Sequence, residues 1–282
     1  MKHKQLLILL LLVSACSSQN LAPVTPTTAV ATNLQILVAS DDFAVGISRV
    51  PFVFFDGPNR TADVTTVTVQ AFDLSSDPPV AGWQGEAQSF NDYEVPYWVI
   101  YPEIPAAGVW GMNAVVTFPD GSTNDIQFAI QVDDAFNYPT VGEMAIPTEN
   151  RTTPDHALQE ISSDPEPEPS FYETTITQAL SSGRPTVIMF ATPAFCQTAV
   201  CAPAVDSLKT VHERYPDELN YIQVEIFEDF QEGIVAESVS DWRLASEPWT
   251  YVVDGSGVIT GRFGGPISPQ ELLQAIEDVL SE

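Results

Sequence analysis

The chain has 282 residues, enough for about two domains of ordinary size. It carries 38 Asp and Glu against 10 Lys and Arg, a formal net charge of −28. Charge-driven binding to nucleic acid or to anionic lipid headgroups is excluded, because both depend on clusters of Lys and Arg. The 44% hydrophobic and 10% aromatic content excludes disorder of the whole chain.

Residues 1–15 have the pattern of an export signal. Lys2 and Lys4 precede an apolar run at 6–13, which is far shorter than the ~20 residues of a membrane-spanning helix. The ending Val-Ser-Ala-Cys resembles the lipobox of bacterial lipoproteins, which implies cleavage before Cys16 and lipidation of Cys16. We therefore expect a lipid anchor at Cys16 on the outer face of the bacterial cytoplasmic membrane or in the periplasm. The alternative is an ordinary secretory signal that is cut nearby.

Residues 16–33 are rich in Ser, Thr, Pro and Ala and predict a flexible tether. Residues 34–134 then show short alternating strands separated by turn sequences, with no helical pattern. This spacing favours an all-β antiparallel sandwich, similar in kind to immunoglobulin modules. Its aromatic residues form either a core or a binding face for a partner protein: Trp83, Tyr93, Tyr97, Trp98 and Tyr101.

Residues 135–169 contain repeated prolines and end in alternating proline and acid. Such a sequence disfavours helix and sheet, so we predict a stiff, extended acidic linker. Residues 157–161 are a candidate for one short edge strand of the next domain.

Residues 170–282 change to alternating helices and strands. The predicted order is a helix at 171–180, a strand at 185–191, a helix from about 196 to 215, a strand at 219–227, a helix near 234–242, strands at 250–253 and 258–263, and a helix at 269–280. The last helix has Ser268 as its N-cap and an apolar face. This order predicts a small α/β domain with helices on both faces of its sheet.

Cys196 and Cys201 stand at a strand-to-helix junction of this domain, and Pro248 begins the strand before its closing hairpin. The arrangement resembles the thioredoxin superfamily across residues 170–282, and the hairpin is most similar to that of membrane-anchored thiol–disulfide oxidoreductases. The resemblance implies that Pro248 is cis and lies against the cysteines. It also implies catalytic roles for Cys196 and Cys201, and a substrate-docking rim of Phe195, Pro248 and Trp249.

The cysteine spacing departs from the C-x-x-C of thioredoxins, because four residues separate Cys196 from Cys201. On a regular helix, Cα atoms five residues apart lie ~8.7 Å from each other, beyond the ~7 Å limit for a disulfide. Oxidation therefore requires Cys196 to lie ahead of the first helical turn, or that turn to unwind. A cysteine at a helix start has a lowered pKa, so we expect Cys196 to attack a substrate disulfide and Cys201 to resolve the mixed disulfide.

Other functions stay open beside this hypothesis. Some peroxiredoxins share the C-x-x-x-x-C spacing, which implies a thiol peroxidase, but Thr192 stands one residue further from Cys196 than in that family. A third possible function is that of a non-enzymatic surface binding protein with a structural disulfide. Metal handling in related domains needs a histidine, and His212 is the only one here. We expect a lipid-anchored, extracytoplasmic thiol–disulfide oxidoreductase acting on protein thiols and disulfides, without metal, cofactor or nucleic acid.

Overall fold

The computed structural model describes residues 34–61, 63–196 and 198–281. The predicted signal peptide at 1–15, the lipidation site Cys16 and the tether at 16–33 lie outside the described residues. Within the described ranges, no helix is both long enough and apolar enough to cross a bilayer.

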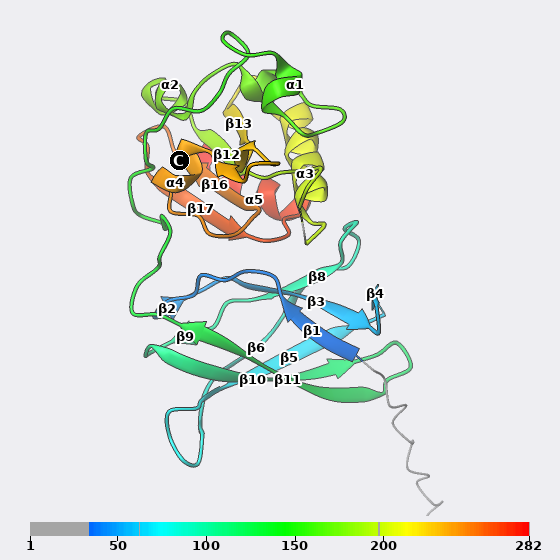
Figure 1. The fold of residues 1–282 in the computed structure, drawn as a ribbon. Helices are drawn as coiled ribbons and strands as arrows, with labels where there is room; N and C mark the ends of the chain where they lie inside the picture. Colours follow the sequence, from blue (N-terminus) through cyan, green and yellow to red (C-terminus); the bar gives the residue numbers. More distant parts are fainter. Residues whose placement is uncertain (1–33, 62, 197, 282) are drawn as a thin grey trace, which may run out of the picture.

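Residues 34–134, here called the β domain, form two main antiparallel sheets (Figure 1). One has the strand order β1-β3-β8-β7 with β4 beside β3, and the other has the order β11-β10-β5-β6. A small third sheet pairs β2 with β9. The strands are β1 (Leu34–Val38), β2 (Gly46–Ile47), β3 (Val50–Asp56), β4 (Asn59–Arg60), β5 (Thr66–Asp73), β6 (Val80–Glu86), β7 (Gln88–Phe90), β8 (Tyr97–Ile100), β9 (Glu103–Ile104), β10 (Gly108–Thr117) and β11 (Thr123–Val132).

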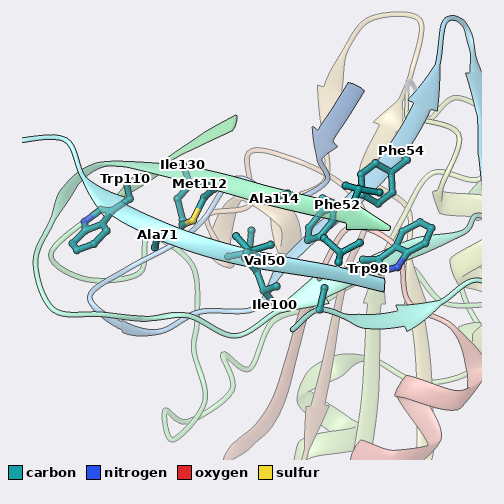
Figure 2. Close-up of a cluster of buried hydrophobic side chains, with 14 of the residues drawn as sticks. Val50, Phe52, Phe54, Ala71, Trp98, Ile100, Trp110, Met112, Ala114 and Ile130 are labelled. Carbon is teal, nitrogen blue, oxygen red and sulfur yellow. The ribbon is translucent and has the colours of Figure 1, made fainter. Parts of the chain in front are cut away.

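Side chains from both main sheets share one hydrophobic core, part of which is drawn in Figure 2. Phe52 and Phe54 of β3 and Trp98 of β8 meet Met112 and Ala114 of β10 there. The rings of Phe54 and Trp98 pack edge to face, with centroids 4.7 Å apart. Trp98 is therefore a core residue. For this one of the five aromatic residues, the structure favours the core over the binding face.

Strands β3 and β8 are buried on both faces. Val53 of β3 and Tyr97 and Val99 of β8 form a second cluster on the side away from the core, together with Val200 of the following domain. A strand covered on both sides needs no polar alternation, which explains why β3 reads as the nearly continuous apolar run VPFVFF.

Residues 170–282, here called the α/β domain, contain a sheet of strand order β13-β12-β16-β17. β13 runs parallel to β12, whereas β16 and β17 are each antiparallel to the preceding strand in that order. This topology agrees with the predicted thioredoxin-like fold. The elements are η1 (Pro169–Tyr172), α2 (Ile176–Ser181), β12 (Thr186–Phe190), α3 (Cys201–Arg214), β13 (Asn220–Val224), β14 (Phe227–Asp229), β15 (Ile234–Val235), α4 (Glu237–Asp241), β16 (Trp249–Val253), β17 (Ile259–Gly264) and α5 (Pro269–Leu280).

Helices cover both faces of this sheet, as predicted. Val187 and Met189 of β12 pack in a cluster with α3 and α5, while Ile188 and Phe190 point to a cluster with α2 and α4. The final helix has the predicted bounds, and the Oγ of Ser268 accepts a hydrogen bond from the backbone of Glu271 at 3.2 Å.

Four predicted elements differ in the structure. The helix predicted at 171–180 is divided into the 3-10 turn η1 and the shorter helix α2. α3 begins at Cys201 rather than near 196. The candidate edge strand at 157–161 is a helical turn, α1 (Leu158–Ile161). The helix expected near 234–242 is shorter, because residues 234–235 pair with β14 as β15 before α4 starts.

The two domains contact each other through two buried ion pairs. Arg49 of the β domain donates to Glu271 of α5 at 2.7 and 2.8 Å, and both side chains are only 7% exposed. Tyr97 and Tyr101, candidates for a partner-binding face, donate to the same carboxylate at 2.6 and 3.2 Å. Arg262 of β17 pairs with the buried Asp42. The β domain thus docks onto the other domain of its own chain.

The first half of the segment at 135–169 packs on the α/β domain. Tyr138 packs edge to face on Trp249, with ring centroids 5.1 Å apart, and Met144 forms an isolated bridge with Val258. Ala145 is buried in the same cluster as the α/β sheet. The first half of the segment therefore belongs to the packing of the α/β domain and is not a free connection, because its few apolar side chains find a surface to cover.

Candidate functional site

Cys196 and Cys201 form a disulfide that joins a loop to a helix. Cys201 is the first residue of α3, and Cys196 lies in the loop between β12 and α3, with the two Cα atoms 5.9 Å apart. That separation suits a disulfide, whereas a continuous helix through both residues would not. Of the two arrangements that the sequence leaves open, the structure has Cys196 ahead of the first helical turn.

The two sulfurs differ in accessibility. Cys196 is half-buried and Cys201 is completely buried. Cys196 is therefore the cysteine of the pair that is partly exposed to solvent. The position of α3 also corrects the expected electrostatics: Cys201, and not Cys196, lies in the first turn, where the helix dipole favours negative charge.

Glu247 is a site residue that the sequence analysis did not identify. Its Oε2 accepts a hydrogen bond from the backbone of Thr192 at 2.7 Å and lies 3.5 Å from the Sγ of Cys201. Burial raises the pKa of Glu247, although the hydrogen bonds from Thr192 oppose the shift. A carboxyl group with a raised pKa thus lies beside the buried sulfur. Its only sequence signal is its place directly before Pro248.

The expected docking residues do not share one surface. The Glu247-Pro248 peptide is cis, as the resemblance implies, but Pro248 is buried and Trp249 is only 1% exposed. Trp249 is covered by Tyr138 and by the guanidinium of Arg262, which lies 4.5 Å from its ring. Of the predicted rim, only Phe195 is exposed. Its ring stacks on Phe230, which the sequence did not single out.

The β domain encloses one side of the cysteine loop. Arg60 donates to the backbone carbonyl of Thr198 at 2.9 Å, and Val200 packs among Val53, Tyr97 and their neighbours. A mainly apolar pocket of about 240 Å³ lies between the domains here; it is lined from the α/β side by Thr198, Val200, Ser246, Glu247 and Gly265, and from the β side by residues of β1, β3 and β4. The disulfide thus lies at the edge of an interdomain cleft.

One set of close ligand atoms in the described residues can hold a metal ion. The sulfurs of Cys196 and Cys201 and a carboxylate oxygen of Glu247 all lie within 4.8 Å of one another. In the disulfide state the sulfurs are not thiolates, so this set offers metal ligands only after reduction.

No protein-family model matches this chain, and no curated protein does. A thiol:disulfide interchange protein of the thioredoxin family from Chlorobium tepidum TLS is similar in structure, with 15% identity, 49% of this chain and 99% of that chain covered, and a TM-score of 0.31. A thioredoxin-like superfamily protein has 14% identity, covers 49% and 98%, and has a TM-score of 0.30. CopC from Methylosinus trichosporium OB3b has 15% identity, covers 33% and 84%, and has a TM-score of 0.25.

A partly exposed cysteine bonded to a buried one, with a carboxyl group beside the buried sulfur, fits a thiol–disulfide oxidoreductase.

Proposed function

We propose that this chain exchanges disulfides with protein substrates through Cys196 and Cys201. The observation that supports this most is the asymmetry of the pair: the accessible Cys196 precedes α3, and the buried Cys201 starts it. A structural disulfide needs no accessible sulfur. A disulfide that closes a loop this short also stabilises the fold by less than the ~3 kcal/mol expected for a 15-residue loop.

In the oxidised state, a substrate thiolate attacks the Sγ of Cys196. The Cys196–Cys201 bond breaks, and its electron pair leaves with Cys201. Glu247 lies 3.5 Å from that sulfur and supplies the proton that neutralises it. A second substrate thiolate then attacks the substrate sulfur of the mixed disulfide and releases Cys196. The substrate dithiol loses two electrons and the protein disulfide gains them, and the reverse sequence reduces a substrate disulfide.

We also propose that this exchange takes place outside the cytoplasm, at a membrane surface. The support is the charged, apolar and small-residue order of residues 1–15, followed by Cys16. For the β domain we propose the immunoglobulin-like class, on the basis of its two antiparallel sheets around one core.

Trapping of mixed disulfides tests the exchange. Cys201→Ser should accumulate a disulfide between Cys196 and substrate, because the resolving sulfur is missing, whereas Cys196→Ser should accumulate none. Variants that trap equally, or wild-type protein that does not turn over a protein disulfide and has a potential below about −300 mV, would identify an inert structural disulfide and overturn the proposal.

A thiol peroxidase is the second candidate, favoured by one contact. The Oγ1 of Thr198 lies 3.2 Å from the Sγ of Cys196, where a hydroxyl can hold a peroxide oxygen beside the attacking sulfur. Fast consumption of peroxide by reduced protein, with sulfenic acid trapped at Cys196 in Cys201→Ser, would support this function in place of exchange.

A further inference from the structure

Two adjoining pockets begin beside the accessible cysteine. The first, of about 300 Å³, has Ala194 and Phe195 at one end and Glu225 at the other. The second, of about 210 Å³, continues from it, because both are lined by Glu160, Ile161, Glu225, Phe227 and Glu228. We call the residues that line either pocket the acidic groove. It leads away from Cys196 on the α/β domain.

The end nearest the disulfide is aromatic. Phe195 and Phe230 stack with ring centroids 4.2 Å apart, and they are 48% and 46% exposed. Phe227 packs edge to face on Phe230 at 5.5 Å. Two large apolar rings held together at the surface, next to a reactive sulfur, offer a contact for an apolar side chain of a bound molecule.

The far end is strongly acidic. Glu149, Glu160, Glu228 and Glu237 are exposed around the second pocket, and the half-buried Glu225 lies between both pockets. The basic groups that face them are Arg151, which pairs with Glu228 at 3.5 Å, and His156. Four exposed carboxylates against one guanidinium and one imidazole give this end a negative potential that attracts cations.

The acidic end is continuous with the aromatic end. An acidic cluster alone would be an ordinary solvated surface, but this one adjoins two exposed, stacked phenylalanine rings next to Cys196. The two ends together offer one apolar contact and one cation contact to an extended molecule.

A single metal ion does not fit these observations. Among the described residues, the one set of ligand atoms close enough to share an ion is that of Cys196, Cys201 and Glu247, outside the groove. The carboxylates of the groove are too dispersed, so its ligand is an extended cation with several donors. The side chains of Lys and Arg have this chemistry.

We propose that the acidic groove binds the part of a substrate polypeptide next to its reactive cysteine, with an apolar side chain on Phe195 and Phe230 and a Lys or Arg side chain among Glu160, Glu228 and Glu237. The inference rests on the proposed exchange at Cys196 and names its substrate class: basic, extended segments. Recognition through the groove leaves the interdomain cleft, on the β-domain side of the loop, free of substrate.

Exchange rates with matched peptides test this. Reduced full-length protein is mixed with peptides whose single cysteine is disulfide-linked to 2-mercaptoethanol, carrying either Lys or Glu at successive distances from the cysteine. Bis(2-hydroxyethyl) disulfide is the uncharged reference. We expect Lys peptides to react about tenfold faster than Glu peptides at low ionic strength, with the ratio falling as salt is added.

Variants connect the preference to the groove. The triple variant Glu160→Gln, Glu228→Gln and Glu237→Gln should bring the Lys-to-Glu rate ratio close to one. A control with the same change of net charge, Glu86→Gln, Glu213→Gln and Glu218→Gln, lies outside both pockets and should keep the ratio. Phe230→Ala should slow the reaction of both peptides more than that of the reference disulfide.

The outcomes separate this inference from the proposed function. If the reference disulfide reacts but Lys and Glu peptides react equally, or if both triple variants lower the ratio alike, the groove does not select substrates and exchange stands without it. If none of the three disulfides reacts, the exchange activity itself is refuted.

Discussion

Replacing Arg49 by Met should strongly destabilise the contact between the two domains. The guanidinium donates to Glu271 and also to the backbone carbonyls of Gly264 and Pro266, each at 2.8 Å. Burial acts to lower the pKa of Arg49, but the charge and hydrogen bond of Glu271 raise it overall. The pair is therefore firmly ionised. Removing one partner of a buried pair leaves an uncompensated charge, at a cost of about 3 to 5 kcal/mol.

Urea unfolding followed by tryptophan fluorescence measures this loss. The tyrosine hydroxyls that donate to Glu271 remain in Arg49→Met, so we expect a value near the lower end of the range. Arg214→Met is the matched control, because Arg214 pairs with Glu277 at the surface, with side chains 56% and 42% exposed. That change should cost less than about 1 kcal/mol.

A double variant distinguishes a lost interaction from a misfolded one. Arg49→Met combined with Glu271→Leu removes both charges, and should recover much of the stability lost in the single variant. The reasoning is refuted if Arg49→Met costs no more than Arg214→Met, because the interdomain pair would then behave as a solvent-exposed one.

Three further predictions concern the cysteine site and its surroundings. Burial raises the pKa of Glu225 to about 7 from its usual 4.5, so the folded chain holds a proton that the unfolded chain releases, and stability falls as pH rises through that window. The free energy of unfolding of Glu225→Gln, measured with urea, should therefore rise relative to that of the wild type by up to about 3 kcal/mol between pH 4 and pH 8. A difference between the two proteins that does not depend on pH would contradict this. Glu247→Gln should slow reduction of the disulfide by dithiothreitol about a hundredfold and flatten its pH profile, whereas an unchanged profile would mean that Glu247 carries no proton in the step. Joint replacement of Cys196 and Cys201 by Ser should cost less than about 3 kcal/mol in urea unfolding, and a larger loss would indicate a mainly structural bond.

The parts of the fold predicted best are those that local sequence determines. The helix at 269–280 and its N-cap, Ser268, contain every signal that locates it, including the proline in the first turn and the apolar stripe, so no distant contact is needed. The order of the α/β elements was recognisable for the same reason. The start of α3 was missed although Pro203 marks it, since a proline fits the first helical turn, whose N–H groups lack helical acceptors.

Contacts between distant residues could not be predicted. Arg49 and Glu271 are 222 residues apart, and a single charge carries no information about its partner. Trp249 was expected at the surface because its sequence neighbours do not show that Tyr138 and Arg262 cover it. Glu247 and Phe230 were missed likewise, since only the fold brings them to Cys201 and Phe195.

The place of Val200 has a consequence for the energetics of the whole chain. This residue lies inside the loop that the disulfide closes, and it packs in a cluster formed otherwise by the β domain. If reduction changes the free energy of domain contact, then domain contact must change the free energy of reduction by the same amount, because the two equilibria share a thermodynamic cycle. A molecule that binds only the β domain and alters that contact would then shift the redox equilibrium of Cys196 and Cys201 without touching either sulfur.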